Sequence, residues 1–540
     1  MKNKLIRSIL ITGVIFCMAA LASCSSEQKQ LETPRELKVE GETLSWSEVK
    51  NASGYGIELD GEEYESGTNS FDLFLLTTEA RKYEIRVRAY SEQSGHDDSD
   101  WSSVLSYTPK IAEGLIFEPA EDKNSVIVRA DPKSNPSGKL VIPEKDPESG
   151  KTVTELRFLA FENCKDITGA IISGEVSTVG SHAFLNCTGL LRVHFSDLVE
   201  NIGAEALMGC TSLTEVRLPA NIEMINTGLF LDCSSLSEIT VPGTVETIKP
   251  CAFKGTAISS MKIPAMVKKL EYGIFSDCAE LTSITVDEAN PYFYSENNCI
   301  LKRKDRTLCY GIKTSRIPDY VTVIGDGAFA GILGLTEVVL PPNVETVGCF
   351  AFDGCRDLES VTFNDGLKTI GRGMSSVFLD CDNLKRVFIP ASVEFIGYGI
   401  FATCGSITDI TVDPANKIYK NDRDCIIRIA DSAYITCGAS DYIPEYVKII
   451  EMHAFARHKF SGGLSVPEGV EKICSYAFGG SSIVSIILPD SMKEIIVDAF
   501  DDCLKISYVE VPSSDVWVYQ ELFKPFSGSN RNVKLVIRNK

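Results

Sequence analysis

The stretch that decides the fold reads LTEVRLPANIEMINTGLFLDCSS over residues 213–235 and LSEITVPGTVETIKPCAFKG over residues 236–255. The second line repeats the apolar pattern of the first. Most copies of this pattern are spaced by 22 or 23 residues, and their large apolar residue before the cysteine position is Phe161, Phe184, Leu207, Phe230, Phe253, Phe275, Phe329, Phe352, Phe378, Phe401, Phe455, Phe478 and Phe500. A fixed period of this length predicts a solenoid, in which each coil packs mainly against its neighbours.

Each copy begins with apolar residues that alternate with polar ones, as in Leu213-x-x-Val216-x-Leu218. This alternation predicts a β-strand with one buried face. A small polar residue stands at a fixed place after the strand, and it is Asn221, Thr244, Asn343, Ser392 or Ser491. We expect its side chain to satisfy backbone groups of the loop that would otherwise be buried without a partner.

Two steps are longer, at 54 residues each: Phe275 to Phe329 and Phe401 to Phe455. They contain related inserts at about residues 287–318 and 413–444. Each insert runs from an Ala-Asn pair through a Cys-Ile pair to a second cysteine, which is Cys309 in the first and Cys437 in the second. Equivalent Phe residues of the two regions lie 126 residues apart, so the sequence predicts that a unit of several coils and one β-hairpin was duplicated.

The recurring signature, strand-Pro-x-x-Val-x-x-Ile-Gly-x-x-Ala-Phe-x-x-Cys, resembles the BspA-like family of bacterial surface leucine-rich repeats. The resemblance covers residues from about 150 to 511. It implies a leucine-rich-repeat solenoid over residues 151–504, mainly β with short helical turns. Residues 110–150 and 505–540 are predicted to be the terminal caps that cover the apolar end coils.

The segment 33–109 precedes the repeats and carries short alternating strands, such as Tyr83 to Tyr90. One buried face per strand predicts an antiparallel β-sandwich. The segment resembles a fibronectin type III domain, in which Trp46 would be the core tryptophan and Tyr83 the tyrosine near the start of a late strand. We interpret this domain as a spacer.

Residues 1–23 have the form of a secretory signal, with a basic start and a short apolar stretch. The ending Leu21-Ala22-Ser23-Cys24 resembles a bacterial lipobox, which implies lipid on Cys24 and a polar leash over residues 24–32. A plain cleaved signal is the alternative. We expect an outer-membrane lipid anchor and exposure at the cell surface, with the periplasmic face as the other possibility.

The charge balance argues against a nucleic-acid-binding protein, because 53 basic and 74 acidic residues give a net charge of −21. The five histidines offer little material for acid–base or metal chemistry. No nucleotide-binding loop, zinc spacing or nucleophile motif is present in the sequence, so we expect no enzyme activity, no metal and no cofactor. A catalytic pair of carboxylates dispersed among the repeats is the remaining enzymatic alternative.

Sixteen cysteines remain after Cys17 and Cys24 are set aside, and nine of them share one repeat phase: Cys164, Cys187, Cys210, Cys233, Cys278, Cys355, Cys381, Cys404 and Cys503. Export favours disulfides. However, Thr256, Ile332 and Ser481 occupy the same phase in other coils, which is typical of a small buried site. Parallel side chains on neighbouring coils also disfavour closure. We therefore predict mainly free, buried thiols.

The candidate ligand-binding residues are Arg217, Lys385, Arg386 and Phe388, on the strand positions that alternate with the buried ones. Arginine and aromatic side chains are frequent anchors of binding surfaces. The resemblance implies adhesion to host extracellular protein or to a bacterial surface protein. The alternative is a glycan-capturing accessory protein of an outer-membrane uptake system, although glycan platforms usually have more tryptophan than Trp46, Trp101 and Trp517. A membrane contact is expected through the lipid anchor only.

Overall fold

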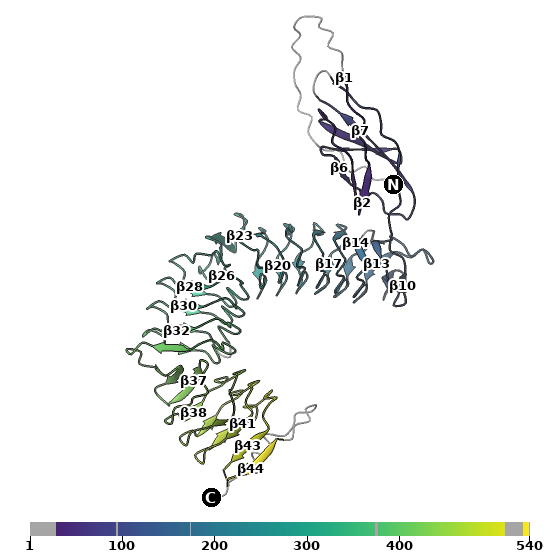
Figure 1. Ribbon diagram of the computed structural model, residues 1–540. Helices are drawn as coiled ribbons and strands as arrows, with labels where there is room; N and C mark the ends of the chain where they lie inside the picture. Colours follow the sequence, from purple (N-terminus) through teal and green to yellow (C-terminus); the bar gives the residue numbers. More distant parts are fainter. Residues whose placement is uncertain (1–28, 93–95, 173, 373–375, 513–532, 539–540) are drawn as a thin grey trace, which may run out of the picture. The chain divides into compact units, whose positions relative to one another are not determined.

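The computed structural model describes residues 29–92, 96–172, 174–372, 376–512 and 533–538, and these residues form strands and turns (Figure 1). The chain divides into two compact units, one ending at Lys110 and the other beginning at Ile111. Within the described ranges, no helix is long and apolar enough to cross a membrane. Cys24, the signal segment and Trp517 lie outside the described residues.

The first unit is a β-sandwich of two antiparallel sheets. One sheet has the order β2 (Lys38–Glu40), β3 (Thr43–Ser45), β6 (Ser70–Asp72), and the other β5 (Glu62–Ser66), β4 (Gly54–Leu59), β7 (Tyr83–Tyr90), β9 (Leu105–Tyr107). A parallel pair joins β1 (Lys29–Gln30) to β8 (His96–Asp97). Trp46 is buried, and its ring meets that of Tyr55 edge-on at 5.1 Å. The hydroxyl of buried Tyr83 accepts a hydrogen bond from the backbone N of Glu79 at 3.2 Å. The alternating-strand prediction is confirmed, and the fibronectin type III assignment stays a prediction.

The second unit is a solenoid, and most of its coils supply strands to two faces. The first strand of each coil comes from the Leu-x-x-Val-x-Leu segment, and these strands form parallel "first-strand sheets". Residues one repeat apart are paired, as Val193 with Val216. The strands are β12 (Gly138–Ile142), β14 (Ile167–Ile172), β16 (Arg192–Phe195), β18 (Glu215–Arg217); β21 (Ser260–Ile263), β23 (Ser283–Val286); β28 (Glu337–Val339), β30 (Ser360–Thr362), β32 (Arg386–Ile389), β34 (Asp409–Val412); and β39 (Leu464–Ser465), β41 (Ser485–Ile487), β43 (Tyr508–Val511), β44 (Lys534–Ile537).

The second strand of each coil comes from the Val-x-x-Ile segment, and these shorter strands form "second-strand sheets", again parallel between coils. An antiparallel pair, β10 with β11, starts the first of these sheets. The strands are β10 (Leu115–Pro119), β11 (Val126–Ala130), β13 (Val153–Leu156), β15 (Thr178–Val179), β17 (Asn201–Ile202); β19 (Met224–Ile225), β20 (Thr247–Ile248), β22 (Lys269–Leu270); β27 (Val323–Ile324), β29 (Thr346–Val347), β31 (Thr369–Ile370), β33 (Phe395–Ile396); and β38 (Ile449–Ile450), β40 (Lys472–Ile473), β42 (Glu494–Ile495).

The third side of each coil, around the Ala-Phe-x-x-Cys segment, is a series of tight turns. The expected short helical turns occur here as non-helical turns, because residues with positive φ interrupt any helical run. Some backbone N–H groups then donate to the next coil instead of along the chain, as Phe184 does to Ala206 at 2.8 Å. The side without strands is thereby also hydrogen-bonded from coil to coil.

The core is built from stacked columns. Phenylalanine rings of successive coils stack face to face, for example Phe352 against Phe329 at 5.4 Å and against Phe378 at 5.2 Å. The cysteine column lies beside them, and all sixteen cysteines of the described residues are free thiols, which confirms the prediction. Burial raises the pKa of Cys355 to about 12, so its thiol keeps its proton.

The thiols of the cysteine column form structural hydrogen bonds. All of the nine except Cys164 donate to the carbonyl of the large apolar residue in the preceding coil, as Cys355 does to Phe329 at 3.0 Å and Cys210 to Phe184 at 3.2 Å. Thr256 is a hydroxyl donor in the same column and binds Phe253 O at 2.8 Å. Most coils therefore have a small side chain with a donor at this position, and Ile332 and His458 are exceptions.

The prediction for the small polar residue after each first strand is confirmed for four coils. Their side chains donate to loop carbonyls: Thr244 to Ala220 and Ile222, Asn343 to Asp319, Ser392 to Leu367, and Ser491 to Val470.

The two inserts are antiparallel three-stranded units that continue into the second-strand sheets. Their strands are β24 (Phe293–Glu296), β25 (Cys299–Lys302), β26 (Leu308–Tyr310) and β35 (Tyr419–Asp422), β36 (Cys425–Arg428), β37 (Ala433–Cys437). The structure shows that the second cysteines of the two inserts are not at equivalent positions. Cys309 lies at a register shift, where it has no partner on the neighbouring strand, and its equivalent in the second insert is Ile435. The equivalent of Cys437 in the first insert is Gly311. The two cysteines are therefore not copies of one another.

Candidate functional site: a sheet face and a junction pocket

The candidate anchors Arg386 and Phe388 lie on β32 and alternate with buried Val387 and Ile389. Both are exposed on the same face of the first-strand sheet, and 43% of Phe388 is accessible to solvent. Across the sheet order β28-β30-β32-β34, Phe388 belongs to an exposed row with Val339, Thr362 and Thr411. We call this row of four side chains the Val339–Thr411 row. It consists of two apolar and two threonine side chains.

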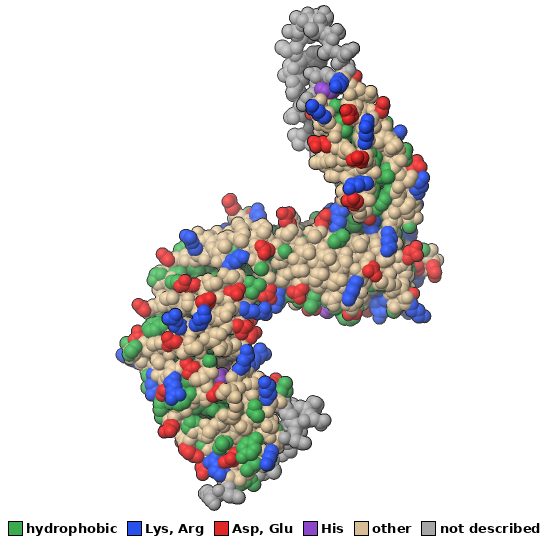
Figure 2. All heavy atoms as spheres, viewed as in Figure 1, with side chains coloured by type: hydrophobic (Ala, Val, Ile, Leu, Met, Phe, Trp, Pro, Cys, Tyr) green, Lys and Arg blue, Asp and Glu red, His purple; other side chains and the backbone are tan. Residues whose placement is uncertain are grey.

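Charges of both signs flank the row. Lys385 forms an ion pair with Glu359 at 2.9 Å, and Arg386 stands in register between Ser360 and Asp409. The positive charges of Lys385 and Arg386 are therefore balanced by nearby carboxylates. The visible face of the solenoid likewise shows Lys/Arg and Asp/Glu side chains interspersed rather than gathered by sign (Figure 2).

Arg217 is not brought together with the other three anchors. It lies on β18, in a different first-strand sheet, where it pairs with Asp197 at 3.1 Å and contacts His194. In the repeat it takes the place of Phe388 and not that of Arg386. The structure thus separates the predicted site into the β32 cluster and a lone arginine.

Sequence reasoning missed a pocket of about 310 Å³ where the coil of Phe401 meets the coil of Phe455. The pocket lies at the second repeat junction, above the second insert. Its lining includes Thr403, Thr436, Cys437, Arg457 and His458.

The first repeat junction, where the coil of Phe275 meets the coil of Phe329, can be compared with the second because equivalent residues lie 126 positions earlier. There buried Tyr310 packs edge-on against Phe275 at 5.7 Å, and Lys313 donates to the carbonyl of Ala279. The second junction has Thr436 and Ala439 at these two positions, and both line the pocket. Replacement of one large and one long side chain by small ones accounts for the space.

The backbone beside the pocket is unusual. In the column before the cysteine position, a residue with positive φ recurs, and in the other coils it is Asn, Asp or Gly. Thr403 (φ 67°) and Arg457 (φ 56°) are the exceptions among the described coils, and both line the pocket. A threonine or an arginine at positive φ strains the local backbone, and such strain is often found at functional sites.

At the first junction the equivalent of Arg457 is Gly331, where a Cβ atom would lie 2.4 Å from the Cβ of Ser276. We expect Arg457→Gly to raise the free energy of unfolding by up to about 1 kcal/mol, because it removes a left-handed cost of roughly 1–2 kcal/mol against a glycine entropy cost of roughly 0.5–1 kcal/mol. Urea unfolding monitored by circular dichroism measures it. A loss of stability instead would mean that the Arg457 side chain holds the junction together.

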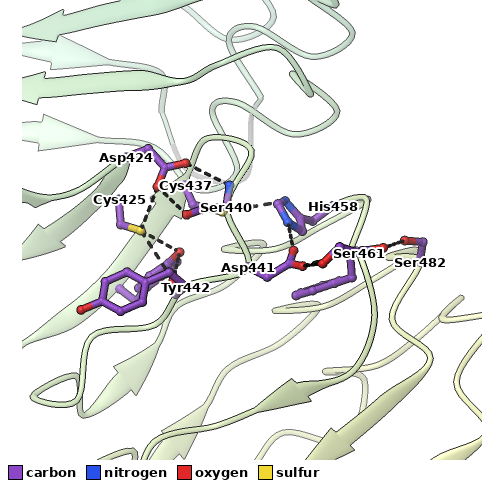
Figure 3. A network of polar contacts seen from close by, with 11 residues as sticks. Asp424, Cys425, Cys437, Ser440, Asp441, Tyr442, His458, Ser461 and Ser482 are labelled. Carbon is purple, nitrogen blue, oxygen red and sulfur yellow. Dashed lines mark hydrogen bonds and ion pairs between the residues drawn. The ribbon is translucent and has the colours of Figure 1, made fainter.

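A polar network, drawn in Figure 3, includes Cys437 and His458, which line the pocket. His458 occupies the cysteine column of its coil, and its Nε2 lies 2.9 Å from Asp441 Oδ1. Asp441 also accepts hydrogen bonds from the backbone N of Ser461 at 2.9 Å and from its hydroxyl at 2.5 Å. The thiol of Cys437 lies 3.9 Å from His458 Nδ1. A thiol, an imidazole and a carboxylate are therefore in line beside the pocket.

The protonation states follow from the surroundings. Burial raises the pKa of Asp441, but the hydrogen bonds from Ser461 and His458 outweigh it, so its pKa is lowered overall and it is a carboxylate. Burial lowers the pKa of His458 and raises that of Cys437 well above the usual value. The resting state is a neutral thiol and a neutral imidazole. No group of three or more metal-ligating side chains occurs in the described part of the chain.

The comparisons with known proteins identify the family to which these repeats belong. The BspA type leucine rich repeat region model matches residues 154–282, 307–422 and 428–535, in six copies. These ranges cover more than half of the chain, and the chain belongs to the BspA-type leucine-rich-repeat family. The fold prediction of a leucine-rich-repeat solenoid is therefore confirmed. The comparison with curated proteins gives no match.

Several solved structures are similar over most of the chain. A leucine rich cell surface protein from Faecalibacterium prausnitzii is 21% identical, with 79% of this chain and 99% of that chain covered and a TM-score of 0.40. A leucine-rich repeat protein from Eubacterium ventriosum is 17% identical, with coverages of 79% and 99% and a TM-score of 0.42. The pneumococcal vaccine antigen PcpA is 15% identical, with coverages of 80% and 100% and a TM-score of 0.40.

Proposed function

We propose that this chain is a non-enzymatic binding protein of the cell envelope, and that its first-strand sheets bind a macromolecular ligand in adhesion to host extracellular protein or to other bacteria. The observation that carries the proposal is the exposed Val339–Thr411 row with Arg386 beside it. A flat row spread over four coils suits an extended partner better than a small molecule, because many modest contacts are supported by a few anchors.

The rest of the chain fits this role as part of the same proposal. Lipid on Cys24 would hold the protein at the outer membrane, and the sandwich of residues 33–109 would act as a fibronectin type III-like spacer. Contact with the membrane would be made through the anchor alone. Nucleic acid is not a proposed partner, since the net charge is −21.

The glycan-capturing alternative receives no support from the tryptophans that the structure describes. Trp46 is in the sandwich core, with 3% of its surface exposed. Trp101 lies beneath Arg86 and Arg88, whose guanidinium carbons are 5.0 and 4.8 Å from its ring centroid. The Trp46 ring is therefore closed to a sugar, and arginine side chains already pack on the half-buried Trp101 ring. We therefore keep a protein as the proposed ligand.

The experiment is a binding screen of the soluble chain from Ser25 to Lys540 against extracellular matrix proteins, bacterial surface proteins and glycans, repeated with Arg386→Ala/Phe388→Ala. We expect this double variant to bind the protein ligand at least tenfold more weakly, since about 1.4 kcal/mol is lost with two central anchors. Its melting temperature should hardly change, because both side chains are exposed.

A matched control exists on the other face. Phe395 is 39% exposed on β33, and Lys368 is an exposed cation of the preceding coil. Phe395→Ala/Lys368→Ala removes the same side-chain types from the second-strand face and should leave binding intact. Equal binding by wild type and Arg386→Ala/Phe388→Ala would place the site elsewhere, and binding of glycans alone would favour the alternative function.

A further inference from the structure

The second insert holds a pair of cysteines whose geometry differs from that of the cysteine column. Cys425 on β36 and Cys437 on β37 are direct partners in an antiparallel register. The backbone N of Gly438 donates to the carbonyl of Asp424 at 2.8 Å, and this bond places the two cysteines at a non-hydrogen-bonded position of the ladder. At such positions Cα atoms approach to about 4.5 Å, which is inside the range that a disulfide spans.

The two side chains also point to the same side. Both belong to the core cluster that contains Phe455, and the hydroxyl of Tyr434 donates to Cys425 Sγ at 3.2 Å. The parallel directions that disfavour disulfides in the cysteine column do not apply to two strands of a hairpin. A shift of the register at Ile435 is what places Cys437 opposite Cys425.

The first insert lacks this pair. Its Cys299 is equivalent to Cys425, but the position of Cys437 is taken by Gly311, where a Cβ atom would lie 2.1 Å from the ring of Phe329. The second insert has space for a cysteine side chain at the position of Gly311, and this cysteine lines the pocket. Cys437 lines the pocket, whereas Cys425 is fully buried behind it.

A base stands beside Cys437, the member of the pair that lines the pocket. Asp441 accepts from His458 Nε2, so the ring proton is on Nε2 and Nδ1 is free to accept the proton of the Cys437 thiol, 3.9 Å away. The carboxylate then stabilises the imidazolium that forms. These groups come from the insert and from the next coil, and they meet only because the coils stack.

We propose that Cys425 and Cys437 form a thiol–disulfide exchange site that takes small-molecule disulfides through the junction pocket and ends as an intramolecular disulfide. Cys437 transfers its proton to His458, and its sulfur attacks one sulfur of the bound disulfide R–S–S–R. The S–S bond of the reagent breaks, and the first R–S⁻ leaves and takes the proton from His458. Cys437 is then in a mixed disulfide with R–S.

Cys425 completes the reaction. Its sulfur attacks Cys437 Sγ, its proton passes to the second R–S⁻, and that group leaves as R–SH. The protein loses two thiols and gains one S–S bond, while R–S–S–R is reduced to two R–SH. Because the resting thiol is protonated, the exchange is slow near neutrality, and the pair is found reduced until a disulfide enters the pocket.

The test is to incubate the folded Ser25–Lys540 chain with 2-hydroxyethyl disulfide, remove the reagent, and count thiols in denaturant without reductant. We expect the count of 16 to fall by two beyond any adducts on the half-buried Cys251, Cys309, Cys349 and Cys474, with peptide mass spectrometry showing a Cys425–Cys437 linkage and a free Cys299. An unchanged count, or a linkage between members of the cysteine column instead, overturns the proposal.

Three variants test the roles. Cys425→Ser should carry a mercaptoethanol adduct on Cys437 and no disulfide, and adducts on other buried cysteines would contradict entry through the pocket. Cys437→Ser should leave Cys425 unmodified, because nothing then reaches it. His458→Gln should slow formation of the disulfide about tenfold without changing its position, and an unchanged rate would remove His458 as the base.

Discussion

Phe352→Ala is expected to lower the free energy of unfolding by at least about 3 kcal/mol, the lower end of the usual cost of removing a buried phenylalanine. The ring is completely buried and stacks between two other rings, at 5.4 Å from Phe329 and 5.2 Å from Phe378. Its loss leaves a cavity and interrupts the stacking between three coils at once. Urea unfolding followed by circular dichroism measures the change.

Phe388→Ala is the matched control, because it removes the same side chain from the exposed face of a coil two repeats further along the chain. Its effect should stay within about 0.5 kcal/mol. If Phe352→Ala costs less than 1 kcal/mol, the phenylalanine column is not what holds the coils together, and stability would have to come from the two sets of sheets.

Asn416→Ala is expected to destabilise the protein by about 3 kcal/mol or more. The buried Asn416 amide donates to the carbonyls of Pro390 and Val393 at 2.9 and 3.1 Å, and its oxygen accepts from the backbone N of Ile418 and Tyr419 at 2.9 and 2.8 Å. Alanine leaves these four backbone groups without the partner, at about 1–3 kcal/mol for each that water does not reach.

The chain supplies both a replicate and a control. Asn290 makes the equivalent four bonds in the first insert, so Asn290→Ala should cost a similar amount. Asn343 is exposed and makes one bond of this kind, to Asp319, so Asn343→Ala should cost about 1 kcal/mol or less. Equal and small effects at all three positions would contradict this account of the loops. Thermal or urea unfolding distinguishes these outcomes.

Repetition made the fold predictable from the sequence. The thirteen copies of the repeat show which positions are apolar in every coil and therefore buried. The alternation of apolar and polar residues along β32 correctly predicted that Arg386 and Phe388 are exposed. The donor role of the cysteine column also has a sequence signal, since Thr256 and Ser481 replace cysteine in it.

The pocket and its thiol were missed because they depend on differences between copies and not on what the copies share. Thr436 in place of Tyr310 and His458 in the cysteine column are visible only when the two regions are aligned at 126 residues. The pairing of Cys425 with Cys437 further requires the register shift at Ile435, for which residue spacing alone gives no signal. The carboxylates that balance the charges of Lys385 and Arg386 could likewise be identified only from the register of the neighbouring strands.

The central claim is that the ligand lies on the first-strand face around β32. Hydroxyl-radical footprinting of the complex with the protein ligand recovered in the screen tests it most directly, because it reads the exposure of individual side chains. The account predicts that Val339 and Phe388 are protected in the complex, while Leu504, exposed by 72% on another coil, reacts as in the free protein. Full reactivity of Phe388 in the saturated complex would contradict it.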